Sequence, residues 1–475
     1  MFNITGSVSA LVAAILACLT LMFVWGGTEQ VTFNWVAMDD DYSAADLAAK
    51  RHPIQSYEIP DAGDYSNAGG GVAAPVLDGD NFVLWLNISG FRADYMEKAE
   101  TPFLDGVGGS STRAMTPTFP ALNWSSLMSQ ATGLTADGHG VVGNSMRDPG
   151  TGEVKQYPSD LSLLKAEPIW TTAKKAGLGV LVHDWPFSQQ QPAEGGADIF
   201  KPTFDISLSD EDRLNAIFDA WSSHTGETKL RLVMGSLHGL RKAAQDYGTR
   251  EEDTLKAITA MDSTLSGFFK KLIDKWPDLR GGDGDKLHVV LTTDHGMVDA
   301  EKLINFEDLM GEMANQVDYV VDEGIAHLWF KDTPPDGMDM DEFVEFYDSE
   351  LKKRIYWRSF APDAYPSDWK LAAEGGHLGD RLLLLKPPYA FHTEKGSEGV
   401  YAPAETAGPF AASGYWVNDS SRMKGQMFAF SLTGGGGYSS DLGDVRATQV
   451  YPSVLQLLGL SAPTDLADSE GLGFE

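Results

Sequence analysis

The sequence predicts an α/β domain with a central, mostly parallel sheet flanked by helices. Short apolar runs, which fit strands buried on both faces, alternate along the chain with amphipathic segments of helical period. The chain has 475 residues and 43% hydrophobic content, enough for one large domain or two ordinary ones. Alternation of this kind is typical of a sheet whose strands are mostly parallel.

The predicted elements follow one another in a regular order. The first strand is the apolar run Phe82–Ile88. A helix over Glu167–Ala176 leads into a strand at Gly179–Val182, and a long amphipathic helix over Glu251–Leu272 leads into a strand at Leu287–Thr292. Each strand is short enough to be buried in a sheet, and each helix is long enough to cover one face of it.

The N-terminal segment predicts a membrane anchor. Val8–Trp25 is almost continuously apolar, and no charged residue precedes Glu29, so the run has about the length that crosses a bilayer core, roughly 20 residues. A cleaved signal peptide is the alternative, although such peptides usually begin with basic residues, which this one lacks. Lipidation at Cys18 is a third reading, which the apolar residues after Cys18 disfavour. We expect an uncleaved, single-pass helix.

The chain divides by composition into four parts. Residues 1–27 form the predicted anchor, and residues 28–78 an extended connector rich in Asp, Ala, Tyr and Gly. Residues 79–465 form the α/β domain, and residues 466–475 a C-terminal tail. The connector is expected either to pack on the domain or on a partner, or to be a solvated linker.

Charge and cysteine content exclude some functions. The formal net charge is −32 and the sequence pI is about 4.5, so the surface should repel phosphate backbones, which argues against nucleic-acid binding. The single cysteine, Cys18, excludes an intrachain disulfide and a thiolate metal cluster.

A family resemblance rests on one short motif and on several further motifs that follow one another along the chain in the family's order. Asp294-His295-Gly296-Met297 follows a predicted strand directly. Further motifs are Ser89-Gly90-Phe91-Arg92, Phe119-Pro120, His139-Gly140, Tyr247-Gly248, Gly414-Tyr415 and Tyr451-Pro452-Ser453-Val454-Leu455. In number and order, over most of residues 82 to 462, these resemble the nucleotide pyrophosphatase/phosphodiesterase family of the alkaline phosphatase superfamily. The resemblance implies an alkaline-phosphatase-like domain that lies outside the cytoplasm.

The resemblance also implies which positions should carry the chemistry. Enzymes of that family hold two metal ions and use a hydroxyl nucleophile. The first-strand Asp ligand is matched here by Ser89, and the Thr nucleophile by Asn123, a residue type that often caps helices. Ser126 matches an Asn that holds the phosphoryl oxygen. An Asp and a His four residues apart are matched by Arg241 and Gln245.

The last family ligand, a His, is matched by Ser413, so only Asp294 and His295 remain as ligand positions. Neutral hydroxyls and amides are poor ligands for a dication. We therefore predict no catalytic residues and no resident metal, with zinc or another divalent metal only if the site is rearranged. We expect Asp294 and His295 to persist because they cap and pack a strand end rather than because they form a residual metal site. The predicted vestigial pocket comprises Ser89, Asn123, Ser126, Arg241, Gln245, Asp294, His295 and Ser413.

Charge balance suggests how such a pocket stays stable without metals. Ser89 removes one negative charge, and Arg241 supplies a fixed positive one, which we expect to ion-pair with Asp294. His238 and Asp246 lie close by in the sequence and could be proposed as substitute ligands, but their spacing does not match.

Three functions follow from this reading. The favoured one is a membrane-anchored, catalytically inactive phosphodiesterase-like protein that acts as a structural or interaction subunit of a membrane-associated complex. Its domain would lie on the periplasmic or extracellular side, against a membrane-protein partner. The alternatives are an active phosphodiesterase or phosphatase-type hydrolase with a rearranged metal site, and a metal-free module that binds a phosphate or another small ligand. Fold alone licenses none of these activities.

Overall fold

The computed structural model confirms the α/β class and shows a mixed central sheet. It describes residues 79–107, 112–192, 195–335, 337–371, 377–433, 444–468 and 470–472, all within one compact unit, Pro53–Glu475. The predicted anchor and the connector up to residue 78 lie outside the described residues. None of the described helices is both long and apolar enough to span a membrane.

The central sheet has eight strands. β18 runs antiparallel to its neighbours β8 and β2, and the other paired strands are parallel. In spatial order the strands are β19 (Val445–Arg446), β2 (Thr112–Thr116), β18 (Gly425–Ser431), β8 (Lys286–Thr292), β1 (Asn81–Ile88), β7 (Leu230–Leu237), β5 (Gly179–His183) and β6 (Ile199–Phe200).

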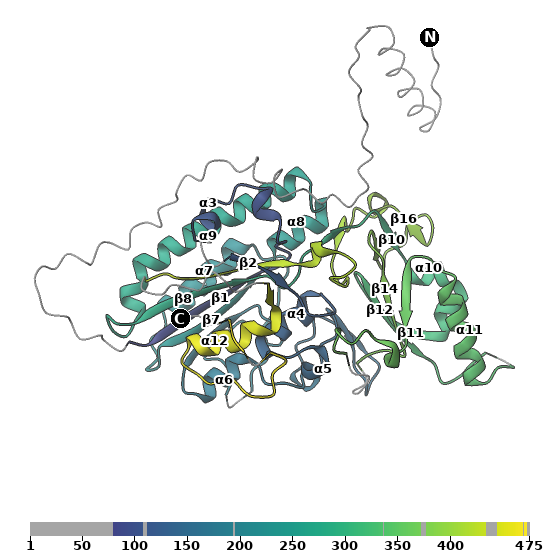
Figure 1. Cartoon of the computed structure of the whole chain (residues 1–475), viewed down its shortest axis with the longest axis horizontal. Coiled ribbons are helices and arrows are strands. Elements are labelled where there is room, and N and C mark those ends of the chain that lie inside the picture. The colour runs from purple at the N-terminus through teal and green to yellow at the C-terminus, as the bar shows by residue number, and fades with distance from the viewer. Residues whose placement is uncertain are drawn as a thin grey trace, which may run out of the picture. The chain divides into compact units, whose positions relative to one another are not determined.

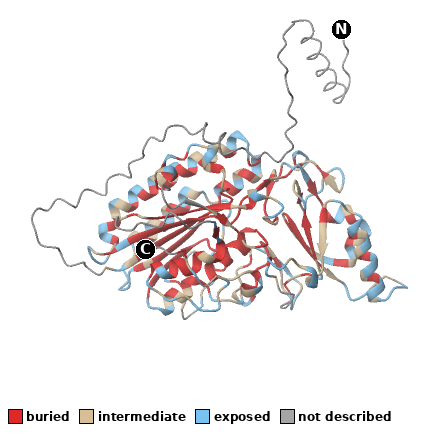
Figure 2. Cartoon of the chain, in the orientation of Figure 1, coloured by how far each residue is buried: buried red, intermediate tan, exposed pale blue. Residues whose placement is uncertain are grey.

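The strand β1 lies between β7 and β8, and its position explains its composition. Both faces of β1 are covered by helices, so its residues from Phe82 onward are buried, as the continuous apolar run predicts. The parallel pairing brings the carboxyl ends of β1, β7 and β8 to one edge of the sheet. Ser89 continues the pairing of β1 with β7 by donating from its N–H to Leu237 O at 2.9 Å. Figure 2 shows the buried residues concentrated along this sheet.

Helices cover the sheet in two layers (Figure 1). The predicted helices at 167–176 and 251–272 are present as α6 and α9, and α9 continues because Trp276 and Leu279 keep its inner face buried. One layer comprises α3 (Pro102–Val107), α7 (Asp210–Ser222), α8 (Gly239–Tyr247) and α9 (Glu252–Leu279); the other comprises α4 (Asn123–Thr132), α5 (Ala136–His139), α6 (Ile169–Lys175) and α12 (Val450–Leu457).

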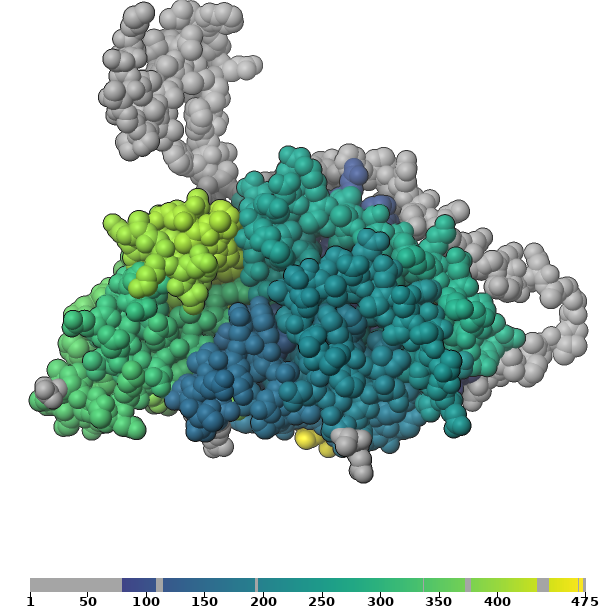
Figure 3. Space-filling view, turned by 180° about the vertical axis from the view of Figure 1, so that it is seen from behind, coloured from purple at the N-terminus to yellow at the C-terminus, as the bar shows by residue number. Residues whose placement is uncertain are grey.

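A small lobe, Lys302 to Met423, has its own apolar core around Phe343, Tyr347 and Trp357. Figure 3 shows the lobe in green beside the larger body. Its helices are α10 (Phe306–Met310) and α11 (Met340–Lys352). Its two sheets contain β10 (Lys302–Ile304), β15 (Tyr389–Phe391) and β16 (Val400–Tyr401), and β11 (Val317–Asp322), β12 (Ile325–Phe330), β14 (Arg381–Leu385) and β13 (Trp357–Phe360).

Minor elements complete the chain. Two small ribbons pair β3 with β4 and β9 with β17. In the predicted C-terminal tail, Asp468 pairs with Arg446 and Leu472 is buried in the main core. The bounds are β3 (Ser145–Arg147), β4 (Val154–Gln156), β9 (Val298–Asp299), β17 (Ala411–Ala412) and the 3-10 turns η1 (Tyr95–Glu97), η2 (Leu161–Leu163), η3 (Gly311–Gln316), η4 (Pro362–Ala364), η5 (Pro403–Glu405), η6 (Ser421–Met423) and η7 (Ala447–Gln449).

Candidate functional site

The first group of predicted site residues surrounds the Asp294 carboxylate. Ser89, just beyond β1, donates from Oγ to Asp294 Oδ2 at 2.6 Å, and Asn123 Nδ2 donates to the same oxygen. The other oxygen accepts the backbone N–H groups of Gly90 at 3.0 Å and His295 at 2.8 Å. Two side chains and two backbone amides therefore donate to one fully buried carboxylate.

Asn123 does not cap its helix, and that part of the prediction is wrong. Asn123 is the first residue of α4, and the preceding Leu122 occupies the N-cap position without a side-chain hydrogen bond. The Asn123 amide instead donates to Asp294 and, at 3.1 Å, to Ser89 Oγ. The buried N–H of Trp124, which has no partner within the first turn of the helix, donates to Asn144 Oδ1 at 2.9 Å. The Asn123 amide thus links the start of α4 to the residues that follow β1 and β8.

His295 is held by the backbone around it. Its Nδ1 lies 2.8 Å from Gly296 O, and its Nε2 lies 3.4 Å from Asp294 Oδ2. Gly296 is required because an added Cβ would lie 1.8 Å from Arg422 O. The Asp-His-Gly sequence therefore ties the end of β8 to β1 and to the 421–424 turn, which favours the capping and packing role for Asp294 and His295.

A second group of site residues surrounds Glu323, which sequence reasoning missed. Arg241 Nη2 donates to Glu323 Oε1, with Gln245 Nε2 3.4 Å from the same oxygen. Ser413 donates to Oε2 from both its N–H, at 2.6 Å, and its Oγ, at 2.8 Å. The expected ion pair between Arg241 and Asp294 is therefore wrong, because the guanidinium pairs with Glu323 instead.

The β11–β12 hairpin delivers Glu323 to this position. Glu323 and Gly324 form the two-residue turn, and Glu323 has a φ of +54°, in the left-handed region that costs a side chain about 1–2 kcal/mol. A Cβ on Gly324 would lie 2.7 Å from Ser413 O, so glycine is needed for the close approach. The turn therefore presses against the Ser413 segment and directs the Glu323 side chain to Arg241.

The two groups adjoin at Gly90. Its N–H donates to Asp294, and an added Cβ would lie 3.2 Å from Arg241 Cα. The Gly90 backbone therefore contacts both the Asp294 carboxylate and the Arg241 backbone. Ser89, Asn123, Asp294 and His295 meet directly at the carboxyl ends of β1 and β8, and Arg241, Gln245 and Ser413 meet beside them through Glu323.

Neighbouring charges set the acidity of the second group. Burial acts to raise the pKa of Glu323, but the Arg241 guanidinium and the Ser413 donors hold it below its usual value. Burial and the adjacent Glu323 charge raise the pKa of Asp322 to about 7, against the N–H groups of Ser145 and Asn144 that it accepts. Glu323 is thus the stronger acid of this adjacent pair.

The side chains of the remaining named residues hydrogen-bond to neither Asp294 nor Glu323 in the described chain. Ser126 is fully buried on α4, and its Oγ has no hydrogen-bond partner among the described residues. His238 occupies the N-cap position of α8 and is buried against the ring of Phe204, with neither ring nitrogen bonded within the described chain. Asp246 forms an ion pair with Lys242 on the exposed side of α8, so it does not replace a metal ligand of the site.

The residues present do not fit a two-metal centre. A catalytic zinc site takes three protein ligands, and here one carboxylate and one imidazole occupy the matching positions. Each Asp294 oxygen accepts two hydrogen bonds, and the Glu323 carboxylate is paired with the Arg241 guanidinium. Across the described residues, no three His, Cys, Asp or Glu side chains gather closely enough to hold a metal ion.

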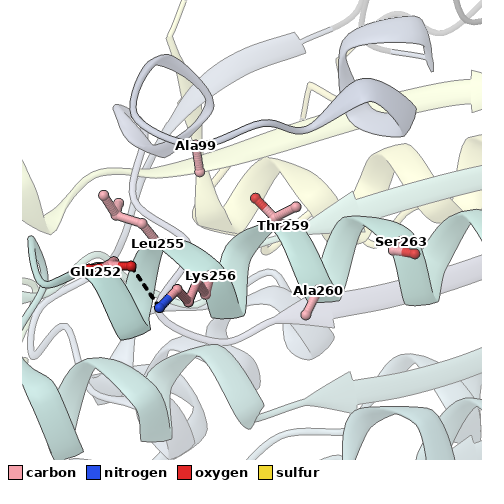
Figure 4. A pocket seen from close by; sticks show the side chains of 7 residues that line it. All are labelled: Ala99, Glu252, Leu255, Lys256, Thr259, Ala260 and Ser263. Carbon is pink, nitrogen blue, oxygen red and sulfur yellow. Dashed lines mark ion pairs between the residues drawn. The ribbon is translucent and has the colours of Figure 1, made fainter.

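A surface groove lies elsewhere, along the outer side of α9 (Figure 4). Its lining combines apolar side chains with two hydroxyl-bearing residues and the ion pair between Glu252 and Lys256 at 2.7 Å. The groove contains none of the predicted site residues, so it is not part of this site. It is lined by Ala99, Glu252, Leu255, Lys256, Thr259, Ala260 and Ser263.

Comparison with known proteins identifies the class. The chain belongs to the type I phosphodiesterase / nucleotide pyrophosphatase family, whose model matches residues 83–416. It is 22% identical over 314 residues to an uncharacterized pyrophosphatase/phosphodiesterase of Schizosaccharomyces pombe, covering 60% of this chain and 59% of that protein. It is 26% identical over 242 residues to human ectonucleotide pyrophosphatase/phosphodiesterase family member 1, covering 49% of this chain and 25% of that protein.

The chain therefore spans only part of the length of these relatives. Among solved structures, murine ectonucleotide pyrophosphatase/phosphodiesterase 5 superposes with a TM-score of 0.64 at 20% identity, over 82% of this chain and 97% of that one. The human counterpart gives a TM-score of 0.66 at 19% identity, over the same shares of the two chains. At this identity, the superpositions establish the fold.

Proposed function

We propose that this chain is a non-catalytic member of its family and acts as a structural or interaction subunit of a membrane-associated complex. The observation that carries the proposal is the contact between Asn123 and Asp294. The residue at the position of the family nucleophile is an amide, and it is bonded to the retained ligand carboxylate in a fully buried group. Asn123 has no hydroxyl to act as a nucleophile, and its amide occupies an oxygen of Asp294 that a metal ion would need.

Chemistry supports this reading from two directions. A covalent phosphoryl intermediate needs a hydroxyl, thiol or similar nucleophile with an activating base or metal, and an amide supplies none of these. Metal-assisted hydrolysis needs ions that polarise the phosphoryl oxygens. Ser89 and Asn123 are hydrogen-bonded to Asp294, and the other matching group is bonded to Glu323. Ser89, Asp294 and Ser413 are fully buried.

The two alternatives find less support. A rearranged hydrolase would need one of the nearby hydroxyls of Ser125 or Ser126 as nucleophile, and neither oxygen has a hydrogen-bonded base among the described residues. A phosphate-binding module would need Arg241 to be available, but its guanidinium already pairs with Glu323.

A metal and turnover assay on the purified protein tests the catalytic part. After incubation with zinc and desalting, we expect no stoichiometric metal by elemental analysis, and background hydrolysis of bis(p-nitrophenyl) phosphate. Asp294→Ala should not change either result. Metal-dependent turnover in the natural protein that disappears in Asp294→Ala would overturn the proposal in favour of the rearranged hydrolase.

The role at the membrane has its own test. If Val8–Trp25 is an uncleaved anchor and the domain acts through contacts, a membrane-protein partner should contact the anchor, the connector and part of the domain. A stable complex buries more than about 1,000 Å². Gentle detergent extraction and affinity purification should recover one partner in a fixed ratio. A free monomer, or a mature chain that begins beyond Trp25, would contradict this role.

A further inference from the structure

We propose that Arg241, Gln245 and Ser413 form a built oxyanion-binding site whose occupant is the protein's own Glu323 carboxylate. The site would accept a small carboxylate or inorganic phosphate if the Glu323 side chain were removed. The Glu323 side chain therefore acts as a tethered plug that excludes such ions. The inference concerns binding alone, so it does not depend on whether the chain is catalytic.

The donors define the chemistry of this site. A guanidinium, a hydroxyl and a backbone N–H converge on the two oxygens of one carboxylate, with the Gln245 amide at the margin, 3.4 Å away. Guanidinium and backbone N–H groups are the donors that proteins use to bind carboxylates and phosphates. Among the described residues, Glu323 is the carboxylate that forms an ion pair with Arg241.

The burial of the donors shows that they need an anion. The Arg241 side chain is 4% exposed and Ser413 is fully buried, so an empty site would leave a guanidinium without a counter-ion inside the protein. The Glu323 side chain is 12% exposed, so part of it reaches the surface and its removal would open a path to the donors. A small anion could therefore reach the same point from solution once the side chain is gone.

The backbone shows that the plug is a specific arrangement. Glu323 adopts a φ of +54° that favours glycine, and its carbonyl accepts from Phe391 N–H at 2.7 Å, while the Gly324 carbonyl accepts from Leu385 N–H at 2.9 Å. Both turn carbonyls are thus anchored in the small lobe. Substitution by glycine suits this conformation, so Glu323→Gly should keep the turn and remove the carboxylate.

The test measures anion binding to the full chain by thermal shift and calorimetry. At matched ionic strength with chloride, Glu323→Gly should show saturable stabilisation by acetate and by inorganic phosphate, and the natural protein should show none. Arg241→Met in the Glu323→Gly background should weaken binding roughly ten-fold or more, since a charged hydrogen bond is lost. Phosphate binding without acetate binding would also support the site, with the larger ion as its preferred occupant.

Two results would overturn the proposal. One is equal phosphate affinity in the natural protein and in Glu323→Gly, because the plug would then block nothing. The other is a folded Glu323→Gly protein that binds neither ion. If Glu323→Gly does not fold, Glu323→Gln keeps the side-chain size and removes the charge. It should unfold at a lower temperature than the matched control Glu345→Gln on the exposed face of α11, and unchanged stability would reject the need for an anion.

Discussion

Removing the Arg241 guanidinium should destabilise the protein more than an ordinary surface substitution does. Arg241→Met preserves much of the apolar stem but leaves the Glu323 carboxylate, which is 12% exposed, without its cation. Breaking a buried ion pair by removing one partner typically costs 3–5 kcal/mol. Because the N–H and Oγ of Ser413 still donate to Glu323, we expect the lower end, about 3 kcal/mol.

Urea denaturation measures this loss directly, and a thermal scan gives a second estimate. With an unfolding entropy of about 2.1 cal/mol/K per residue, a domain of this length should lose roughly 3 to 4 °C in Tm for ~3 kcal/mol. The matched control is Arg280→Met. Its guanidinium pairs with Asp283, which is 82% exposed, so the loss should fall within the 0–1 kcal/mol of surface pairs.

A second substitution separates charge from packing. Glu323→Gln in the Arg241→Met background removes the unpaired charge, so it should recover part of the stability that Arg241→Met loses. If Arg241→Met falls within about 1 kcal/mol of Arg280→Met, or if the double variant is less stable than Arg241→Met alone, the ion pair does not stabilise the site and the reasoning fails.

Three further outcomes follow from the same site. Asn123→Thr should leave hydrolysis of bis(p-nitrophenyl) phosphate at background with or without zinc, because the ligand positions stay unchanged, and it should lower the unfolding free energy by about 1–3 kcal/mol through the lost amide hydrogen bonds. Ser89→Asp would set a second carboxylate against Asp294, so its loss of stability should be larger at pH 8 than at pH 5, where one proton can be shared. Asp322, with its pKa raised to about 7, holds a proton in the folded state that the unfolded state releases near pH 4. Its contribution to the free energy of unfolding is therefore complete below about pH 4 and disappears as the pH rises through 7. Asp322→Asn should flatten this decrease in the free energy of unfolding, measured by denaturation at several pH values over that range.

The sequence predicted the parts of the fold that depend on local pattern. The apolar run at Phe82–Ile88 and the amphipathic period after Glu251 correspond to β1 and α9. The reversed direction of β18 was not predictable, because an apolar run such as that of Gly425–Ser431 looks the same in either direction. Strand direction is set by contacts between distant segments.

The candidate site was predictable only where a motif marks it. Ser89, Asn123 and Asp294 meet because each follows or begins an element that the resemblance places at the strand ends. Glu323 left no such signal. The sequence Asp322-Glu323-Gly324 between two apolar runs indicates a hairpin turn, but its contact with Arg241 spans 82 positions and rests on a left-handed backbone that Glu rarely adopts.

The partner of Arg241 shows why the predicted ion pair failed. Two N–H groups, a hydroxyl and an amide already donate to Asp294, so its oxygens have partners without the guanidinium. The guanidinium is therefore free to compensate a different buried charge, and Glu323 supplies it. The two carboxylates therefore have different direct partners: hydrogen-bond donors at Asp294 and a paired guanidinium at Glu323. A metal ion at Asp294 would first have to displace the donors from Ser89 and Asn123, and one at the second group would have to displace Arg241. Reverting a single position thus leaves the other obstacles in place, and for this reason we expect no single substitution to restore metal-dependent hydrolysis.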